Sequence, residues 1–418
     1  MESSLSVAPS RQPGLRDVFA QPGYRRLWTA RTVSQWGDTF NVVALALLIY
    51  DLTGSGLGVS GVVAAEIAPV LLLAPFAGPL IDRWPRVRVM VSADLLRLVL
   101  AVVLALWHDA PAGVYAIAFG MSVGAVFFNP AASSVLPALV PKDHLVAANS
   151  GIWTAAVLSQ IALAPLAGLL VTQAGYGPAF AINAATYAVS ALVLRGLRVP
   201  AAPEHLGRRR LFADAREGVR VLVQHRLLRA LATGQLLAAL SAGATSALLV
   251  VLAEDHLGAT GSQYGLLIGA IGIGAALGPL ALLRLIRQPR RPVFVFGPFA
   301  LRGVVDLVIA SVTAIPLAAA ALVVYGVGTS TGAVTFNSML QAETPEHVRG
   351  RVFASMDVLW QGGRLISLAV GGLLADRYGI QVVYYLGGVL LLAAAAAGIP
   401  ASRPRRSERE AATGGGPA

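Results

Sequence analysis

Long apolar runs, separated by short polar stretches, fill most of the 418-residue chain. A helix needs about 20 mostly apolar residues to cross the ~30 Å hydrocarbon core of a membrane. The pattern predicts twelve such helices, at 28–50, 59–81, 89–107, 114–136, 147–172, 178–195, 228–252, 263–284, 293–313, 317–340, 352–375 and 380–399. Turn-forming residues separate them, as in the stretch 52–56 (Leu-Thr-Gly-Ser-Gly). The sequence therefore predicts an all-α membrane protein with about twelve transmembrane helices.

Short sequence matches divide these helices into two sets of six. The triplet 53–55 (Thr-Gly-Ser) recurs at 260–262, and the pair 128–129 (Phe-Asn) recurs at 336–337, so the offset is about half the chain. Two sets of six helices with the same orientation imply a pseudo-twofold axis along the membrane normal, with a site near the midplane between them. We therefore expect an N-terminal cytoplasmic segment (1–27), a first half (28–199), a basic cytoplasmic linker (200–227), a second half (228–399) and a disordered cytoplasmic tail (400–418).

Composition agrees with a chain that lies almost wholly in the membrane. Hydrophobic residues make up 56% of it and charged residues 13%, with a mean hydropathy of +0.69, which leaves no stretch for a separate soluble core. The chain has no cysteine, and its histidines are scattered over loops and helix ends without metal-ligand spacing. No nucleotide-binding loop is present. We expect no catalytic residues, no cofactor and no metal site, and hence no enzyme.

The distribution of arginine predicts the orientation. The net charge is +11, and the basic residues gather in alternate loops. The loops between them carry Asp51, Asp109, Glu254 and Asp255, with Arg377 as their only basic residue. Loops rich in Lys and Arg stay cytoplasmic, so we expect a multi-pass protein of a bacterial inner membrane with both termini in the cytoplasm. Because the charge is spread and not focused in one patch, we expect no nucleic-acid partner. In the linker, an amphipathic helix over 212–226 is expected to lie along the membrane surface.

The loop after the second predicted helix carries the most specific motif. Residues 78–88 (Gly-Pro-Leu-Ile-Asp-Arg-Trp-Pro-Arg-Val-Arg) resemble the G-x-L-x-D-R-x-G-R motif of the major facilitator superfamily, with Pro85 where a glycine is usual. Other stretches resemble its macrolide-efflux and siderophore-exporter branch, at 24–28, 34–38, 52–55, 128–131 and 344–351. The resemblance covers essentially the whole chain. It implies the superfamily fold and alternating-access transport, most often export of a drug or metabolite coupled to inward proton flow.

The fifth predicted helix departs from the exporter pattern. Where exporters carry G-P-x-x-G-G, this chain reads Ala-Pro-Leu-Ala-Gly over 164–168, so Pro165 and Gly168 retain the expected kink and close packing. A proton-coupled symporter that imports a small metabolite therefore stays the alternative to export. In either case we expect a monomer that binds a small-molecule substrate and protons in the lipid bilayer.

The 78–88 motif also suggests a gate at the cytoplasmic ends of the helices. A charged loop can pair with an acidic residue of the other half in one state and release it in another. The expected gating residues are Gly78, Leu80, Asp82, Arg83 and Arg86, with Asp357 as the partner of an arginine. The alternative is that the arginines only determine topology.

Ionisable residues within the predicted spans are candidates for proton coupling. A charge at the bilayer centre costs roughly 2.5–3.5 kcal/mol on insertion scales, so such residues usually face a partner or a wet cavity. Arg31, Ser34, Asp38 and Asn41 share one face of the first helix, and Glu66 lies in the second. We expect Asp38 or Glu66 to carry the proton. The alternative for Asp38 is a structural ion pair with Arg31.

Other charges come in pairs or stand alone. Two pairs at helical spacing, Asp94 with Arg97 and Arg302 with Asp306, are expected to be structural. Arg364 is expected to attract an anionic substrate group or to pair with Asp38. The glycines at 265, 269, 274 and 278 have the spacing of close helix packing.

Overall fold

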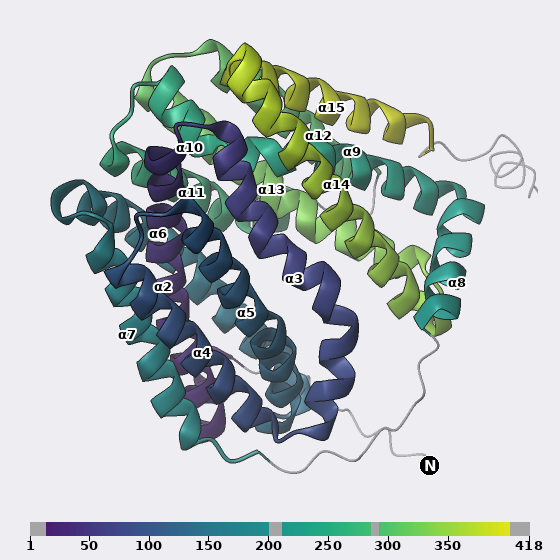
Figure 1. The fold of residues 1–418 in the computed structure, drawn as a ribbon. Coiled ribbons are helices and arrows are strands. Elements are labelled where there is room, and N and C mark those ends of the chain that lie inside the picture. The colour runs from purple at the N-terminus through teal and green to yellow at the C-terminus, as the bar shows by residue number, and fades with distance from the viewer. Residues whose placement is uncertain (1–13, 200–210, 286–291, 402–418) are drawn as a thin grey trace, which may run out of the picture.

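The computed structural model describes residues 14–199, 211–285 and 292–401, and in these ranges every regular element is a helix (Figure 1). The N-half comprises α2 (Pro22–Thr53), α3 (Gly56–Arg83), α4 (Arg86–Leu106), α5 (Pro111–Leu139), α6 (Leu145–Ala174) and α7 (Tyr176–Arg195). The C-half comprises α9 (Arg226–Ala247), α10 (Leu249–Val251), α11 (Gly261–Leu285), α12 (Pro292–Ser311), α13 (Ile315–Glu343), α14 (Arg349–Tyr378) and α15 (Ile380–Ala401). The remaining elements are α1 (Leu15–Phe19), α8 (Leu211–Gln224), η1 (Lys142–His144), η2 (Leu252–His256) and η3 (Glu346–Val348). The predicted N-terminal segment, linker and tail lie partly outside the described residues.

Eleven of the described helices are long and apolar enough to cross a membrane. The longest helix, α2, has 32 residues but carries five charged side chains and is not one of the eleven. The all-α membrane architecture is therefore confirmed, and the count of twelve stays a prediction. The predicted span 228–252 is not one continuous helix, because α9 ends at Ala247 and the chain continues through α10 into the π-helical turn η2.

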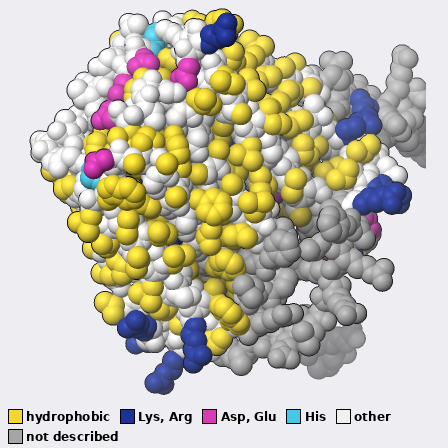
Figure 2. Space-filling view, in the orientation of Figure 1, with side chains coloured by type: hydrophobic (Ala, Val, Ile, Leu, Met, Phe, Trp, Pro, Cys, Tyr) yellow, Lys and Arg dark blue, Asp and Glu magenta, His cyan; other side chains and the backbone are white. Residues whose placement is uncertain are grey.

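The surface has the polarity of a protein embedded in lipid. Hydrophobic side chains cover most of the middle of the visible face, and acidic side chains gather toward the end of the bundle that carries α10 (Figure 2). A charged side chain loses its hydration when it faces hydrocarbon, which costs free energy, whereas an apolar side chain does not. The apolar belt is thus the face that meets the acyl chains.

Buried apolar residues form three clusters, and these show where the halves meet. One cluster joins both halves, with Leu47 of α2 and Tyr384 of α15 among its members. A second contains residues of α1 and the N-half, and a third contains residues of α8 and the C-half. The halves share a core at the end that carries the α2–α3, α6–α7 and α14–α15 connections, which we call the closed end. At the opposite end, which we call the open end, each half has its own core and the two sets of helices diverge (Figure 1).

Glycine residues allow the halves to approach closely along α6 and α11. A Cβ added at Gly265 would lie 2.4 Å from the carbonyl oxygen of Ala164, and one at Gly168 would meet the backbone of Gly261. Gly269 packs on Pro165, whereas Gly274 faces α13 within the C-half. The predicted close packing of these glycines is confirmed, because no larger residue fits where helix backbones touch.

The linker helix α8 packs on the open-end start of α14. Arg351 donates a hydrogen bond of 2.6 Å to Glu217, and a Cβ added at Gly218 would lie 2.5 Å from the carbonyl oxygen of Arg351. Val219 and Val223, four residues apart on α8, are exposed. This helix is attached to the C-half, and its position relative to the membrane surface stays a prediction.

Candidate functional site

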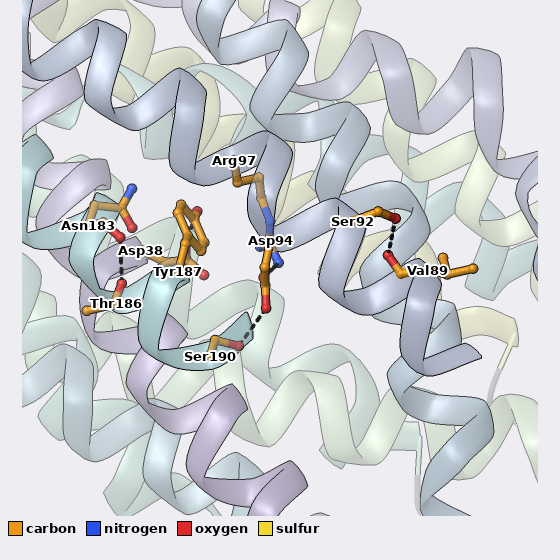
Figure 3. Close-up of polar contacts among 9 residues, drawn as sticks. All are labelled: Asp38, Val89, Ser92, Asp94, Arg97, Asn183, Thr186, Tyr187 and Ser190. Atoms are coloured by element: carbon orange, nitrogen blue, oxygen red, sulfur yellow. Dashed lines mark hydrogen bonds and ion pairs between the residues drawn. The ribbon is translucent and has the colours of Figure 1, made fainter. Parts of the chain in front are cut away.

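A buried polar network in the N-half connects Asp38 of α2 with α4 and α7 (Figure 3). The hydroxyl of Tyr187 donates a hydrogen bond of 2.6 Å to Asp38 Oδ1. The Arg97 guanidinium lies 4.5 Å from the centroid of the Tyr187 ring and interacts electrostatically with Asp38. Arg97 also forms an ion pair of 2.5 Å with Asp94, whose other carboxylate oxygen accepts a hydrogen bond of 2.6 Å from Ser190.

This network places one cation between two carboxylates. Asp94 is completely buried, and Arg97 is only 4% exposed. With both carboxylates ionised the cluster has a net charge of −1, and an uncompensated charge in a low-dielectric interior is costly. A proton on Asp38 or Asp94 neutralises the cluster, and two carboxylates that share one arginine titrate as a coupled pair. The arrangement therefore holds two coupled carboxylates around a single cation.

A glycine brings α7 against α2 beside Asp38. A Cβ at Gly37 would lie 2.0 Å from Thr186 Oγ1 and 2.5 Å from Asn183 Oδ1, so no side chain fits there. Close approach of the two backbones allows the Tyr187 hydroxyl to reach the Asp38 carboxylate. Sequence reasoning singled out Asp38 but missed Tyr187 and its helix. The available signal was the spacing of Asn183, Tyr187 and Ser190, which places three polar side chains on one face of an otherwise apolar span.

The C-half contains a related but simpler arrangement. Arg302 donates a hydrogen bond of 2.8 Å to the hydroxyl of Tyr325, and its guanidinium lies 4.8 Å from that ring's centroid. Asp306 interacts electrostatically with Arg302 and accepts a 3.5 Å hydrogen bond from Ser241. The two charges predicted as a pair are thus close, but their hydrogen bonds go to other helices. Within the part of the chain that the structure describes, Asp306 also has no second carboxylate to share its arginine in the way that Asp38 and Asp94 share Arg97.

Glu66 and Arg364 lie on opposite halves and carry opposite charges that interact. The carboxylate of Glu66, on α3, interacts electrostatically with the guanidinium of Arg364, on α14. Arg364 also donates a hydrogen bond of 3.4 Å to Gln361 on its own helix. Arg364 is not among the groups that interact electrostatically with Asp38, so the alternative in which these two residues pair is not formed in this structure, and attraction of an anionic substrate group by Arg364 stays a prediction. Asp38 has Arg97 as its cationic neighbour, and Arg364 has Glu66.

The other residues of the first predicted helix lie around Asp38. Arg31 is half-buried, and it is not among the groups that interact electrostatically with Asp38, so the alternative ion pair between them is not formed. Ser34 and Asn41 are buried on α2, and Asn41 Oδ1 has no hydrogen-bond partner among the described residues. These side chains extend a polar stripe along the helix, as their spacing predicts.

The predicted gating residues lie at the open end. Gly78, Leu80, Asp82 and Arg83 belong to the last turns of α3, and their side chains lie outside the described part of the structure. Arg86 donates a hydrogen bond of 3.2 Å to the carbonyl oxygen of Ser134, on α5 of its own half. Asp357 lies exposed on α14. The predicted contact between Arg86 and Asp357 is absent in this conformation, because the halves are separated at the open end.

Comparison with known proteins adds a sequence family and a fold. A family model described as transmembrane secretion effector matches residues 17–413. A multidrug efflux pump, Tap, of Mycolicibacterium fortuitum is 28% identical over 364 residues, which cover 83% of this chain and 88% of that protein. An uncharacterized MFS-type transporter of Mycobacterium bovis is 27% identical over 398 residues, 89% of each chain.

Solved structures of transporters share the arrangement of helices. The nucleoside transporter NupG superposes with a TM-score of 0.75 over 92% of this chain and 100% of its own, at 12% sequence identity. A bacterial homologue of the iron transporter ferroportin in an inward-facing state has a TM-score of 0.74 over 91% of this chain and 99% of its own, at 16% identity. At these identities the likeness concerns the fold alone.

Proposed function

Because this chain belongs to the major facilitator superfamily, we propose that it exports a small organic molecule, a drug or secondary metabolite, by proton-coupled alternating access. The chain is a multi-pass membrane transporter and not an enzyme. Export is supported by the description of its family as secretion effectors and by the name of its relative Tap, a multidrug efflux pump.

The observation that supports proton coupling is the Asp38–Tyr187–Arg97–Asp94 network. It holds two carboxylates with one cation. Glu66 interacts electrostatically both with Asp38 of the network and with Arg364 of the other half, so it links the network to the boundary between the halves. A proton taken up by Asp38 changes the charge that Glu66 and Arg364 experience. Such a change gives the two halves different preferred arrangements in the protonated and deprotonated states.

We place the open end in the cytoplasm, because the arginine-rich loops lie there. Substrate then enters from the cytoplasm between the diverging halves, and export requires the closed end to open while the open end closes. Closure of the open end brings α14 toward the α3–α4 loop, which is the movement that lets Asp357 meet the arginines of the predicted gate.

Transport into everted membrane vesicles tests this proposal. Their lumen is acidified by respiration, and exchange of an exported compound for protons releases protons from the lumen. We expect ethidium, a fluorescent drug surrogate, to trigger such release, and Asp38→Asn to abolish it. Asp109→Asn, in an exposed loop, is the matched control and should transport normally. If Asp38→Asn and Glu66→Gln both retain coupled transport, neither carboxylate carries the proton.

Import by symport is the second candidate, and the degraded exporter motif over 164–168 favours it. It predicts proton-driven accumulation of a metabolite in right-side-out vesicles. Accumulation there, with no proton release from everted vesicles, would replace export by import.

A further inference from the structure

We propose that Asp376 of the C-half locks the closed end by capping helix α3 of the N-half, and that this cap breaks each time the closed end opens. The proposal rests on alternating access. It is independent of the direction of transport and of the coupling ion.

Among the described residues, all the hydrogen bonds of the Asp376 carboxylate come from the opposite half. Its Oδ1 accepts a hydrogen bond of 2.6 Å from the backbone N–H of Gly56. Its Oδ2 accepts one of 2.7 Å from the hydroxyl of Ser55 and one of 3.2 Å from the N–H of Leu57. The first N–H groups of a helix have no partner within it, and the helix dipole places partial positive charge there. Asp376 therefore supplies acceptor oxygens for these N–H groups from the opposite half of the molecule. A capping side chain normally comes from the residue that directly precedes the helix in the sequence.

Ser55 shows that the intrahelical cap is present but incomplete. Its side-chain oxygen accepts from the N–H groups of Leu57 and Gly58, at 3.1 and 3.2 Å. Among the described residues, the N–H of Gly56 donates its hydrogen bond to Asp376 alone. When the halves separate, this N–H and the Ser55 hydroxyl lose Asp376 as their acceptor and must donate hydrogen bonds to water instead.

Two glycines make the cap possible by bringing the backbones together. A Cβ at Gly372, one turn before Asp376, would lie 2.8 Å from Leu57 Cα and 2.8 Å from Ser60 Oγ. A Cβ at Gly56 would lie 3.0 Å from the Cβ of Ala375. A further hydrogen bond of 2.5 Å, from the Tyr50 hydroxyl to Asp255, crosses between the halves at the same end. The contact between α3 and α14 is therefore a closely packed interface, and Asp376 is one part of it.

Distance measurement between the halves tests the proposal directly. Because the chain has no cysteine, a single pair can be introduced and spin-labelled. Asp109→Cys in the α4–α5 loop and Thr313→Cys in the α12–α13 loop are exposed sites on opposite halves at the closed end. Loss of a helix cap shifts an equilibrium by about 5- to 30-fold. We expect Asp376→Ala to raise the ratio of long-distance to short-distance populations by about that factor in the full-length protein in lipid nanodiscs.

The controls separate the cap from a general loss of folding. Asp376→Asn keeps an acceptor oxygen without the charge and should give a smaller rise. Arg377→Ala removes the neighbouring charge, whose recorded contact is with the ring of Tyr378 in its own half, and should leave the ratio unchanged. In a double-mutant cycle, Ser55→Ala and Asp376→Ala should be non-additive.

An unchanged distance distribution in Asp376→Ala overturns the proposal. If that variant does not fold, the proposal is overturned by unchanged distance distributions in both Asp376→Asn and Ser55→Ala. The measurement needs neither substrate nor a proton gradient. Failure of proton-coupled export in vesicles, with the Asp376 effect present, therefore counts against the transport proposal alone.

Discussion

Replacing Gly265 by alanine tests whether the α6–α11 contact sets the resting state of the transporter. The added Cβ would lie 2.4 Å from the carbonyl oxygen of Ala164 and 3.0 Å from Pro165 Cα, both on α6 of the opposite half. Ordinary van der Waals contact begins at 3.4 Å, so the helices must separate by about 1 Å at this point. Because both neighbours are backbone atoms, no side-chain rotation relieves the clash.

The size of the effect follows from the cost of overpacking. An extra methyl group in a well-packed interface costs typically 1–3 kcal/mol. The contact exists only where the halves meet at the closed end, so the cost falls on this state and not on the one in which the closed end is open. A difference of 1–3 kcal/mol corresponds to a shift of about 5- to 150-fold in the ratio of the two states.

The spin-label pair at positions 109 and 313 measures this ratio. We expect Gly265→Ala to increase the long-distance population, and a second pair at Lys142→Cys and Glu346→Cys, at the open end, to move closer together. Both open-end sites are exposed and belong to opposite halves.

Two other glycines provide matched controls. Gly274→Ala on the same helix places a Cβ 1.9 Å from the carbonyl oxygen of Val323, inside the C-half, so it should lower thermal stability without changing the ratio. Gly297→Ala meets no atom within 4 Å and should change neither quantity. The reasoning is refuted if folded Gly265→Ala has the wild-type distances, or if Gly274→Ala shifts them equally.

Two further predictions concern charges outside the spanning helices. Burial, followed by repulsion from Asp51 and Asp255, raises the pKa of Glu254 to about 7 from an ordinary 4.5. Separation of the halves takes Asp51 away and exposes Glu254 to water, which lowers its pKa toward the ordinary value, so the closed end should become progressively less stable as the pH rises from 4.5 to 7. The spin-label distances should follow this pH range, and Glu254→Gln should flatten the response; an equal response in that variant contradicts the assignment. The ion pair between Glu217 and Arg351 is partly exposed, so Glu217→Gln should lower the free energy of unfolding by less than about 1 kcal/mol. Thermal unfolding in detergent measures this, and a loss of several kcal/mol would show that α8 is held mainly by that pair.

The helical membrane architecture could be predicted because hydropathy is a local property, whereas the count of twelve spans stays a prediction. A run of apolar residues long enough to cross a bilayer must satisfy its backbone hydrogen bonds internally, and a helix does so. The 78–88 motif, likewise a contiguous stretch, indicated the superfamily that the family match confirms. The span 228–252 was the exception, since a π-helical turn after α9 leaves no distinctive hydropathy signal.

The charged residues of the candidate site were visible in the sequence, but most of their partners were not. Asp94 and Arg97 are three residues apart on one helix, so their ion pair could be predicted from helical spacing. The partners of Asp38 lie on two other helices, and a sequence does not reveal how each helix is rotated about its axis. For that reason the sequence left Arg364 open between an anionic substrate group and Asp38, whereas in the structure its guanidinium interacts electrostatically with Glu66 of the other half.

The sequence by itself determined that this chain is a helical membrane protein, because burial in lipid constrains every segment separately. Only the tertiary structure decided which end is closed, because that depends on contacts between segments hundreds of residues apart. Asp376 illustrates the difference. In the sequence it is one acid near Arg377 in a short loop, and in the structure it caps a helix that begins 320 residues earlier, at Gly56.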